Sequence, residues 1–202
     1  MQTTNRVLII NAHQYVQGIA EGALNKTMVE AIKTFCTERG CEVAQTTIEA
    51  GYSIAEEVEK HLWADVVIVQ APVYWFAAPW IYKKYIDEVF TTGYVQQCFL
   101  RDDGRTRENP DKQYGSGGLL QGKRVMLSLT WNAPKEAFGD PNQAQFEGKT
   151  VDDVFVGTTA SYRFCGMTVL PSFSCFNVQK DPQIEADLER LRAHLASVVF
   201  GE

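Results

Sequence analysis

The amino-acid sequence predicts an α/β fold with a doubly wound parallel sheet, for two reasons. Short apolar runs recur along the chain at residues 7–10 (VLII), 66–69 (VVIV), 125–129 (VMLSL) and 167–170 (MTVL). Each run is too continuously apolar for a half-exposed strand, so we expect parallel strands buried on both faces. Helical patterns lie between the runs, and this alternation favours right-handed crossovers with helices on both faces of the sheet.

A fifth strand and its flanking helices complete the pattern. Residues 42–47 (EVAQTT) alternate in polarity after Gly40, which is typical of an edge strand that follows a helix. Pro79 and Pro182 suit the first turns of two helices, the first of them running toward Phe90. Ligands of doubly wound sheets bind outside the carboxyl ends of the strands, so the candidate sites lie there. Apolar residues at helical spacing form two further sets: Leu24, Met28, Ala31, Ile32 and Phe35, and Ile184, Leu188, Leu191, Leu195 and Val198.

Length and composition limit the classes of protein to consider. The 202 residues suffice for one domain, residues 1–202. No apolar stretch is long enough for a membrane span, and residues 1–6 carry no export signal, so we expect no membrane insertion. A net charge of -6 with scattered basic residues argues against a nucleic-acid partner. The five cysteines form no Cys-x-x-Cys pair and lack ligand-spaced histidines, which favours reduced thiols, a cytoplasmic location and no metal site.

The segment after the first strand, residues 11–27, delivers the chain to a helix N-terminus. Unpaired N–H groups and a partial positive charge there suit a diphosphate, although an ordinary loop with helix caps explains the same residues.

Residues 117–123 (GGLLQGK) match the first seven positions of an ATP-binding P-loop, but Arg124 stands where Ser or Thr is required. This segment also precedes a strand instead of following one, so we reject an ATPase function.

Aromatic residues gather after two other strands. Residues 71–80 (APVYWFAAPW) follow the third strand, where polar turn residues are the norm, and residues 130–134 (TWNAP) follow the fourth. Aromatic, amide and hydroxyl groups together suit a flat ligand with one apolar and one polar edge, such as an isoalloxazine. Trp80 is an exception, because packing in the core or at a subunit interface also explains it.

Six segments distinguish this sequence from a generic α/β protein, and together they closely resemble one protein family. They are residues 62–68 (LWADVVI), 78–80 (APW), 83–90 (KKYIDEVF), 103–107 (DGRTR), 114–119 (YGSGGL) and 127–134 (LSLTWNAP). The family that they resemble is modulator of drug activity B, flavoprotein NAD(P)H:quinone reductases related to the DT-diaphorases. The resemblance extends over nearly the whole chain and implies a flavodoxin-like sheet of five parallel strands in the order 2-1-3-4-5.

The resemblance implies that FAD is the cofactor and NAD(P)H the co-substrate. The implied reaction is a ping-pong, two-electron reduction of quinones to quinols, with hydride passing through flavin N5. Tyr114 would close the reactive slot and hydrogen-bond a substrate oxygen, and Trp75 would form an aromatic wall. His13 is similar to a histidine near the FAD phosphates of DT-diaphorases, with a loop-capping role as the alternative. The implied cofactor-binding residues are His13, Gly22, Ala23, Leu24, Asn25, Thr27, Val73, Tyr74, Trp75, Phe76, Tyr114, Thr130, Trp131, Asn132 and Ala133.

The resemblance also implies a homodimer, in which residues 91–121 help to complete the flavin site across the interface. The alternative function is a regulatory accessory subunit of a potassium efflux system, which is the role of some flavodoxin-like relatives. A one-electron carrier with FMN fits less well, because residues 14–22 differ from the short loop rich in Ser and Thr of such carriers. His61 and His194 fall on helical patterns, and we expect both at the surface.

Overall fold

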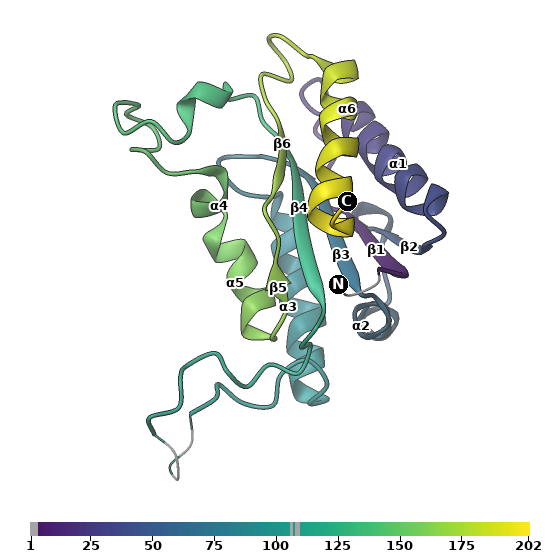
Figure 1. Ribbon diagram of the computed structural model, residues 1–202, viewed down its shortest axis with the longest axis vertical. Helices are drawn as coiled ribbons and strands as arrows, with labels where there is room; N and C mark the ends of the chain where they lie inside the picture. The colour runs from purple at the N-terminus through teal and green to yellow at the C-terminus, as the bar shows by residue number, and fades with distance from the viewer. Residues whose placement is uncertain (1–3, 106, 108–109) are drawn as a thin grey trace.

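A parallel sheet forms the middle layer of the structure, with helices on both of its faces (Figure 1). The computed structural model describes residues 4–105, 107 and 110–202, so residues 1–3 and Thr106 of the segment 103–107 lie outside the described residues. The strand order β2-β1-β3-β4-β5 confirms the expected order, and a further strand, β6, also pairs with β4. The strands are β1 (Arg6–Asn11), β2 (Glu42–Thr47), β3 (Val66–Pro72), β4 (Arg124–Thr130), β5 (Thr168–Val169) and β6 (Phe173–Cys175).

The fifth position of the sheet is divided between β5 and β6, where we expected one strand at residues 167–170. β5 pairs with the beginning of β4, whereas β6 pairs with its end. Pro171 lies between the two strands, and a proline has no N–H to donate to a neighbouring strand. The expected strand is therefore interrupted and resumes at Phe173, closer to the carboxyl edge of the sheet.

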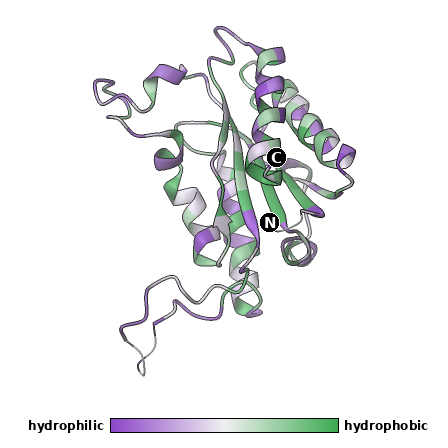
Figure 2. Ribbon diagram, in the orientation of Figure 1, coloured by the Kyte–Doolittle hydropathy of each residue, from purple (hydrophilic) through white to green (hydrophobic). Residues whose placement is uncertain are grey.

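Helices cover both faces of the sheet (Figure 1). Helices α1 (Ala23–Glu38) and α6 (Ile184–His194) share a core with Val7, Ile9 and Ile68, whereas α2 (Ile54–Trp63), α3 (Trp80–Val95) and α5 (Val156–Phe164) pack on the opposite face. Figure 2 shows hydrophobic residues along the central strands of the sheet, whereas the helices carry both hydrophobic and hydrophilic residues. As far as the described residues extend, no helix is long and apolar enough to cross a membrane. The short elements are η1 (Ile48–Ala50), η2 (Lys135–Ala137), α4 (Val151–Val154) and η3 (Leu195–Phe200).

The long connection between α3 and β4 lies at the amino-terminal edge of the sheet. Helix α3 continues to Val95, beyond the expected end at Phe90, so the connection spans residues 96–123 and leads into β4. It is fixed at its base where the N–H of Leu120 donates to the carbonyl oxygen of Cys165 over 2.8 Å. Figure 1 shows this connection at the opposite end of the sheet from the loops that follow β1, β3 and β4.

His61 is fully buried on the inner side of α2, so the expectation of a surface position is wrong. The rings of Phe90, Phe99 and Tyr162 surround it, and its Nδ1 lies 2.9 Å from the carbonyl oxygen of Glu57. A histidine counts as polar in a hydrophobicity pattern, which is why the pattern placed it outside. Burial lowers the pKa of His61 to about 4, so its ring is neutral in the folded protein near neutral pH.

Replacing His61 with phenylalanine should reduce the loss of folding stability that the protein undergoes at acid pH. An unfolded chain protonates a histidine below about pH 6.5, whereas the folded protein resists protonation of His61 until about pH 4. The stability linked to His61 is therefore present above the unfolded pKa and is lost as the pH falls toward the folded one, by on the order of 3 kcal/mol. Urea unfolding at several pH values measures this difference. His194→Phe is the control because His194 is partly exposed, and identical profiles for all three proteins would contradict the expectation.

Candidate functional site

A cavity of about 350 Å³ lies at the carboxyl edge of the sheet, where the segments after β1, β3, β4 and β6 meet. We call it the carboxyl-edge cavity. It brings together these predicted residues: His13, Gly22, Ala23, Leu24, Asn25, Val73, Tyr74, Thr130 and Asn132. Sequence reasoning missed other lining residues, namely Ile19, Ala20, Glu21, Pro72, Val178 and Gln179. The last two follow the fifth position of the sheet, so the rule that ligands bind beyond strand ends would have found them.

The N-terminus of α1 faces this cavity with unpaired backbone N–H groups. Gly22 is the N-cap residue, its φ of 89° lies in the left-handed region, and no side chain caps the helix. The N–H of Lys26 donates to the carbonyl oxygen of Gly22, so the amides of Ala23, Leu24 and Asn25 precede the first N–H that donates within the helix. Together with the helix dipole, these amides suit an anion such as a phosphate.

The side chain of His13 contacts both the start of α1 and the loop of residues 14–22. A Cβ at Gly22 would lie 2.9 Å from Cε1 of His13, so the contact leaves no room for a side chain there. The ring Nε2 lies 3.1 Å from the carbonyl oxygen of Ala20, within the same loop. His13 is 8% exposed and also lines the carboxyl-edge cavity. The position therefore agrees both with a place beside a bound phosphate and with the loop-capping alternative.

A chain of side-chain amides ties the first turn of α1 to two strands. Gln70 in β3 donates from Nε2 to Oδ1 of Asn25 over 3.0 Å, and Asn25 donates from Nδ2 to Oδ1 of Asn11 over 2.7 Å. The same Asn11 oxygen accepts the backbone N–H of His13 over 3.1 Å. Because its side chain is engaged in this chain, Asn25 presents chiefly its backbone to the cavity.

The aromatic loop after β3 exposes a flat apolar surface next to the cavity. Trp75 and Phe76 adopt φ values of 49° and 68°. Left-handed backbone costs about 1–2 kcal/mol for a residue with a side chain, and such strain concentrates at functional sites. The side chain of Trp75 is 93% exposed, whereas Phe76 packs edge-on against Phe146. The hydroxyl of Tyr74 donates to the carbonyl oxygen of Gln14 over 2.7 Å and so joins this loop to the loop after β1.

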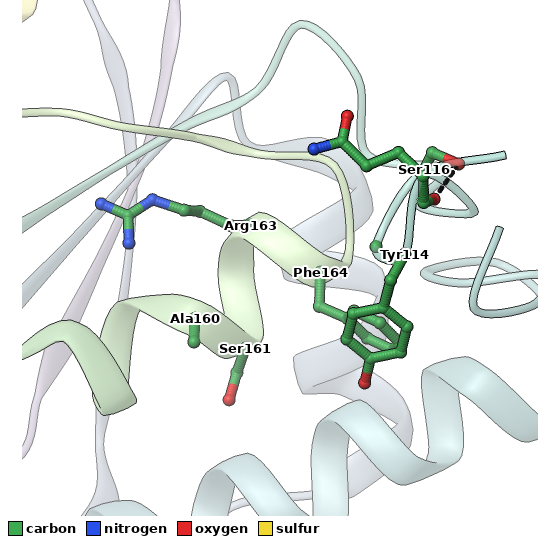
Figure 3. Close-up of a pocket in the computed structure, with 8 residues that line it drawn as sticks. Tyr114, Ser116, Ala160, Ser161, Arg163 and Phe164 are labelled. Atoms are coloured by element: carbon green, nitrogen blue, oxygen red, sulfur yellow. Dashed lines mark hydrogen bonds between the residues drawn. The ribbon is translucent and has the colours of Figure 1, made fainter. Parts of the chain in front are cut away.

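Two further cavities continue from Phe76 along α3 and α5. The first, of about 420 Å³, lies between Phe76, Tyr82 and Ser161. The second, of about 610 Å³, also includes Ser161 and is bordered by Tyr114 and Phe164, whose ring centroids are 5.2 Å apart (Figure 3). The two cavities form a groove, which we call the α3/α5 groove, from the carboxyl edge toward the amino edge.

Six of the predicted residues do not line the carboxyl-edge cavity, for different physical reasons: Thr27, Trp75, Phe76, Tyr114, Trp131 and Ala133. The hydroxyl of Thr27 donates to the carbonyl oxygen of Ala23 over 3.1 Å, one helical turn away from the N-terminus. Tyr114 lies on the connection at the amino edge, at the far end of the α3/α5 groove. A single chain therefore does not bring Tyr114 to the cavity.

The ring of Trp131 lies in the core below the carboxyl edge instead of facing the cavity. It is 2% exposed and packs edge-on against Phe138, Phe146 and Phe155. Ala133 packs against the same core. Between them, Asn132 lines the cavity, as does Thr130 before them. Sequence spacing located the segment correctly, but it could not say which of its side chains turn inward.

The comparisons with known proteins agree with this arrangement. Residues 5–197 match the model of a family with a flavodoxin-like fold. The NADPH:quinone oxidoreductase MdaB of Haemophilus influenzae is 47% identical over 184 residues, which are 91% of this chain and 94% of the relative. The chain belongs to this family, modulator of drug activity B. The resemblance read from the six segments is therefore confirmed.

Two other proteins are similar to this chain at lower sequence identity. The glutathione-regulated potassium-efflux system ancillary protein KefF of Klebsiella aerogenes is 29% identical over 195 residues, 94% of each chain. The crystal structure of a candidate quinone reductase from Klebsiella pneumoniae superposes with a TM-score of 0.77 at 23% identity, covering 96% of this chain and 85% of that one. At that identity, the structural likeness supports the flavodoxin-like fold alone.

Replacing Gly22 with alanine should destabilise the protein more than the same change at Gly40, which follows the other end of α1. Both residues have positive φ, 89° and 76°, a conformation that costs alanine about 1 kcal/mol. Only at Gly22 would the new Cβ also press on the ring of His13, whereas at Gly40 nothing lies within 4 Å. We expect a total loss on the order of 2 kcal/mol for Gly22→Ala. Urea unfolding measures the free energy of unfolding that each variant loses. Equal losses would show that the ring of His13 moves aside at no cost and would contradict the expectation.

Proposed function

We propose that this protein is an FAD-dependent NAD(P)H:quinone oxidoreductase that reduces quinones to quinols by two electrons in a ping-pong reaction. The observation that carries the proposal is the carboxyl-edge cavity, where an uncapped helix N-terminus lies close to an uncovered aromatic loop. The 47% identity to the NADPH:quinone oxidoreductase MdaB supports the same reaction. The fold, the cavity and the relative thus favour the same reaction, the reduction of quinones by NAD(P)H.

The residues around the carboxyl-edge cavity fit a flavin nucleotide. The first-turn amides of α1, with no side chain at Gly22, suit the negative charge of a diphosphate. Thr130 and Asn132 offer a hydroxyl and an amide to the polar edge of an isoalloxazine. The family resemblance favours FAD over FMN. The cofactor supplies hydride transfer at N5.

Trp75 is proposed as the aromatic wall on which the nicotinamide and the quinone bind in turn. Its indole is exposed, and the two consecutive left-handed residues hold it outside the core. One slot that receives two flat substrates successively accounts for a ping-pong order. The role of the protein is then to stack each substrate in the same orientation and to exclude competing reactions.

We further propose a homodimer in which Tyr114 of one protomer completes the site of the other. Within one protomer, the connection that carries Tyr114 lies at the opposite end of the sheet from the loops after β1, β3 and β4 (Figure 1). The seven residues of β4 make that separation about 20 Å. The apolar side chains of Trp80 and Val156 are exposed on the helices that border the α3/α5 groove. The exposure of Trp80 excludes the core packing considered for it. Uncovered apolar surface of this kind favours a subunit interface.

The second candidate function is a regulatory accessory subunit of a potassium efflux system. The 29% identity to KefF, over 94% of both chains, favours it. The fold does not separate the two functions, because both relatives match nearly the whole chain. Quinone turnover by the purified protein without a partner separates them.

Purified protein supplied with FAD should acquire a flavin absorbance spectrum that NADPH bleaches and a quinone restores. The first change reports hydride acceptance from NADPH, and recovery with menadione under anaerobic conditions reports its delivery to a quinone. Chromatography of the released cofactor identifies FAD or FMN. Bound FMN without turnover would favour a one-electron carrier, and a protein that binds no flavin would overturn the proposed function.

Replacing Tyr114 with phenylalanine should lower kcat/KM for menadione by roughly two- to ten-fold, the effect of losing one neutral hydrogen bond. Tyr94→Phe is the matched control, since Tyr94 is also an exposed tyrosine but does not border the cavities near Tyr114. Sedimentation measurements should show a dimer for both variants. Unaltered turnover would remove the role of Tyr114, and a fully active monomer would remove the shared site.

A further inference from the structure

Glu49 contacts the loop of residues 14–22 from outside the carboxyl-edge cavity. It belongs to η1, the short turn that follows the edge strand β2. One carboxylate oxygen, Oε1, accepts the backbone N–H of Tyr15 over 2.7 Å. The other, Oε2, lies 3.7 Å from Nδ1 of His13. A single side chain thus contacts both the loop and the histidine beneath it.

Both ring nitrogens of His13 face oxygen atoms that accept hydrogen bonds. Nδ1 faces the carboxylate of Glu49, and Nε2 faces the carbonyl oxygen of Ala20 over 3.1 Å. The contact with the carboxylate is longer than a hydrogen bond, so the short polar contact of the ring is the one that Nε2 makes with Ala20. Glu49 and Ala20 therefore contact the ring of His13 on its two nitrogen sides, next to the N-terminus of α1.

The other titratable groups around His13 are Glu21 and Tyr74, which line the same cavity. Burial, and after it the charge of Glu49, raises the pKa of Tyr74, so Tyr74 stays neutral and keeps donating its proton to the carbonyl oxygen of Gln14. Glu21 is exposed and makes no contact that would replace Glu49 at the ring. Glu49 is thus the carboxylate in ion-pair contact with His13.

We propose that Glu49 is a positioning residue for the cofactor diphosphate. It fixes the loop of residues 14–22 through Tyr15 and contacts the ring of His13, so that the loop and the ring keep their positions beside the unpaired amides of α1. A bond from a backbone N–H to a carboxylate is charge-assisted and therefore stronger than a neutral one. This inference rests on the proposed function, because it assumes that a flavin nucleotide occupies the cavity.

Titration of the protein with FAD, followed by the quenching of flavin fluorescence, tests the role of Glu49. Glu49→Gln keeps an oxygen for the N–H of Tyr15 but replaces a charge-assisted hydrogen bond with a neutral one, so FAD binding should weaken only about two- to three-fold. Glu49→Ala removes the loop contact altogether and should weaken FAD binding by about ten-fold.

Glu42→Gln is the matched control, because Glu42 is an exposed glutamate at the opposite end of β2. It should bind FAD as the wild type does. Hydrogen exchange of the protein without cofactor adds a readout that does not depend on flavin: the amide of Tyr15 should exchange faster in Glu49→Ala alone.

Three results separate the possible failures. If the wild type binds FAD and both Glu49 variants match it in affinity, the role of Glu49 is overturned while the proposed function stands. If affinity falls in Glu49→Ala while the amide of Tyr15 exchanges as in the wild type, the loop contact does not position the diphosphate, and the role of Glu49 is again overturned. If the wild type binds no FAD at any pH, the proposed function falls and the role of Glu49 toward a cofactor falls with it.

Discussion

All paired strands of the described sheet run parallel, and this constraint decides where each functional segment lies. Parallel strands place their carboxyl ends at one edge, so the loops after β1, β3, β4 and β6 meet there and enclose the carboxyl-edge cavity. Each helix must then return the chain to the other edge. The connection that carries Tyr114 follows such a helix, which is why it lies at the amino edge, far from the cavity of its own chain.

Buried hydrogen-bond networks hold the helices in place on this sheet. On the face of α1, Gln70 and Asn25 join the helix start to β3 and β1. On the opposite face, the fully buried carboxylate of Glu57 accepts hydrogen bonds from Thr46 and Tyr85. An unpaired buried polar group costs about 1–3 kcal/mol, so a network that pairs its members favours one packing arrangement over its alternatives. The first network sets the direction in which the N-terminus of α1 points.

The candidate site depends on contacts between loops that are distant in sequence. Tyr74 reaches the loop after β1 from the centre of the sheet, and Glu49 reaches it from the edge. The strained backbone at Trp75 and Phe76 keeps aromatic rings outside the core, where a flat ligand can cover them. The loop contacts thus hold the site rigid while its aromatic rings stay exposed, and a preorganised binding site requires both.

The sequence by itself determined the alternation of strands and helices, the helix with an apolar face from Leu24 to Phe35 and the aromatic segments, because apolar periodicity and turn residues are local properties. The resemblance in six segments added the family and the strand order. Tertiary structure alone decided that Trp131 and His61 face the core and that Glu49 contacts His13. Those outcomes depend on which surfaces meet across long sequence separations, and no local pattern encodes them.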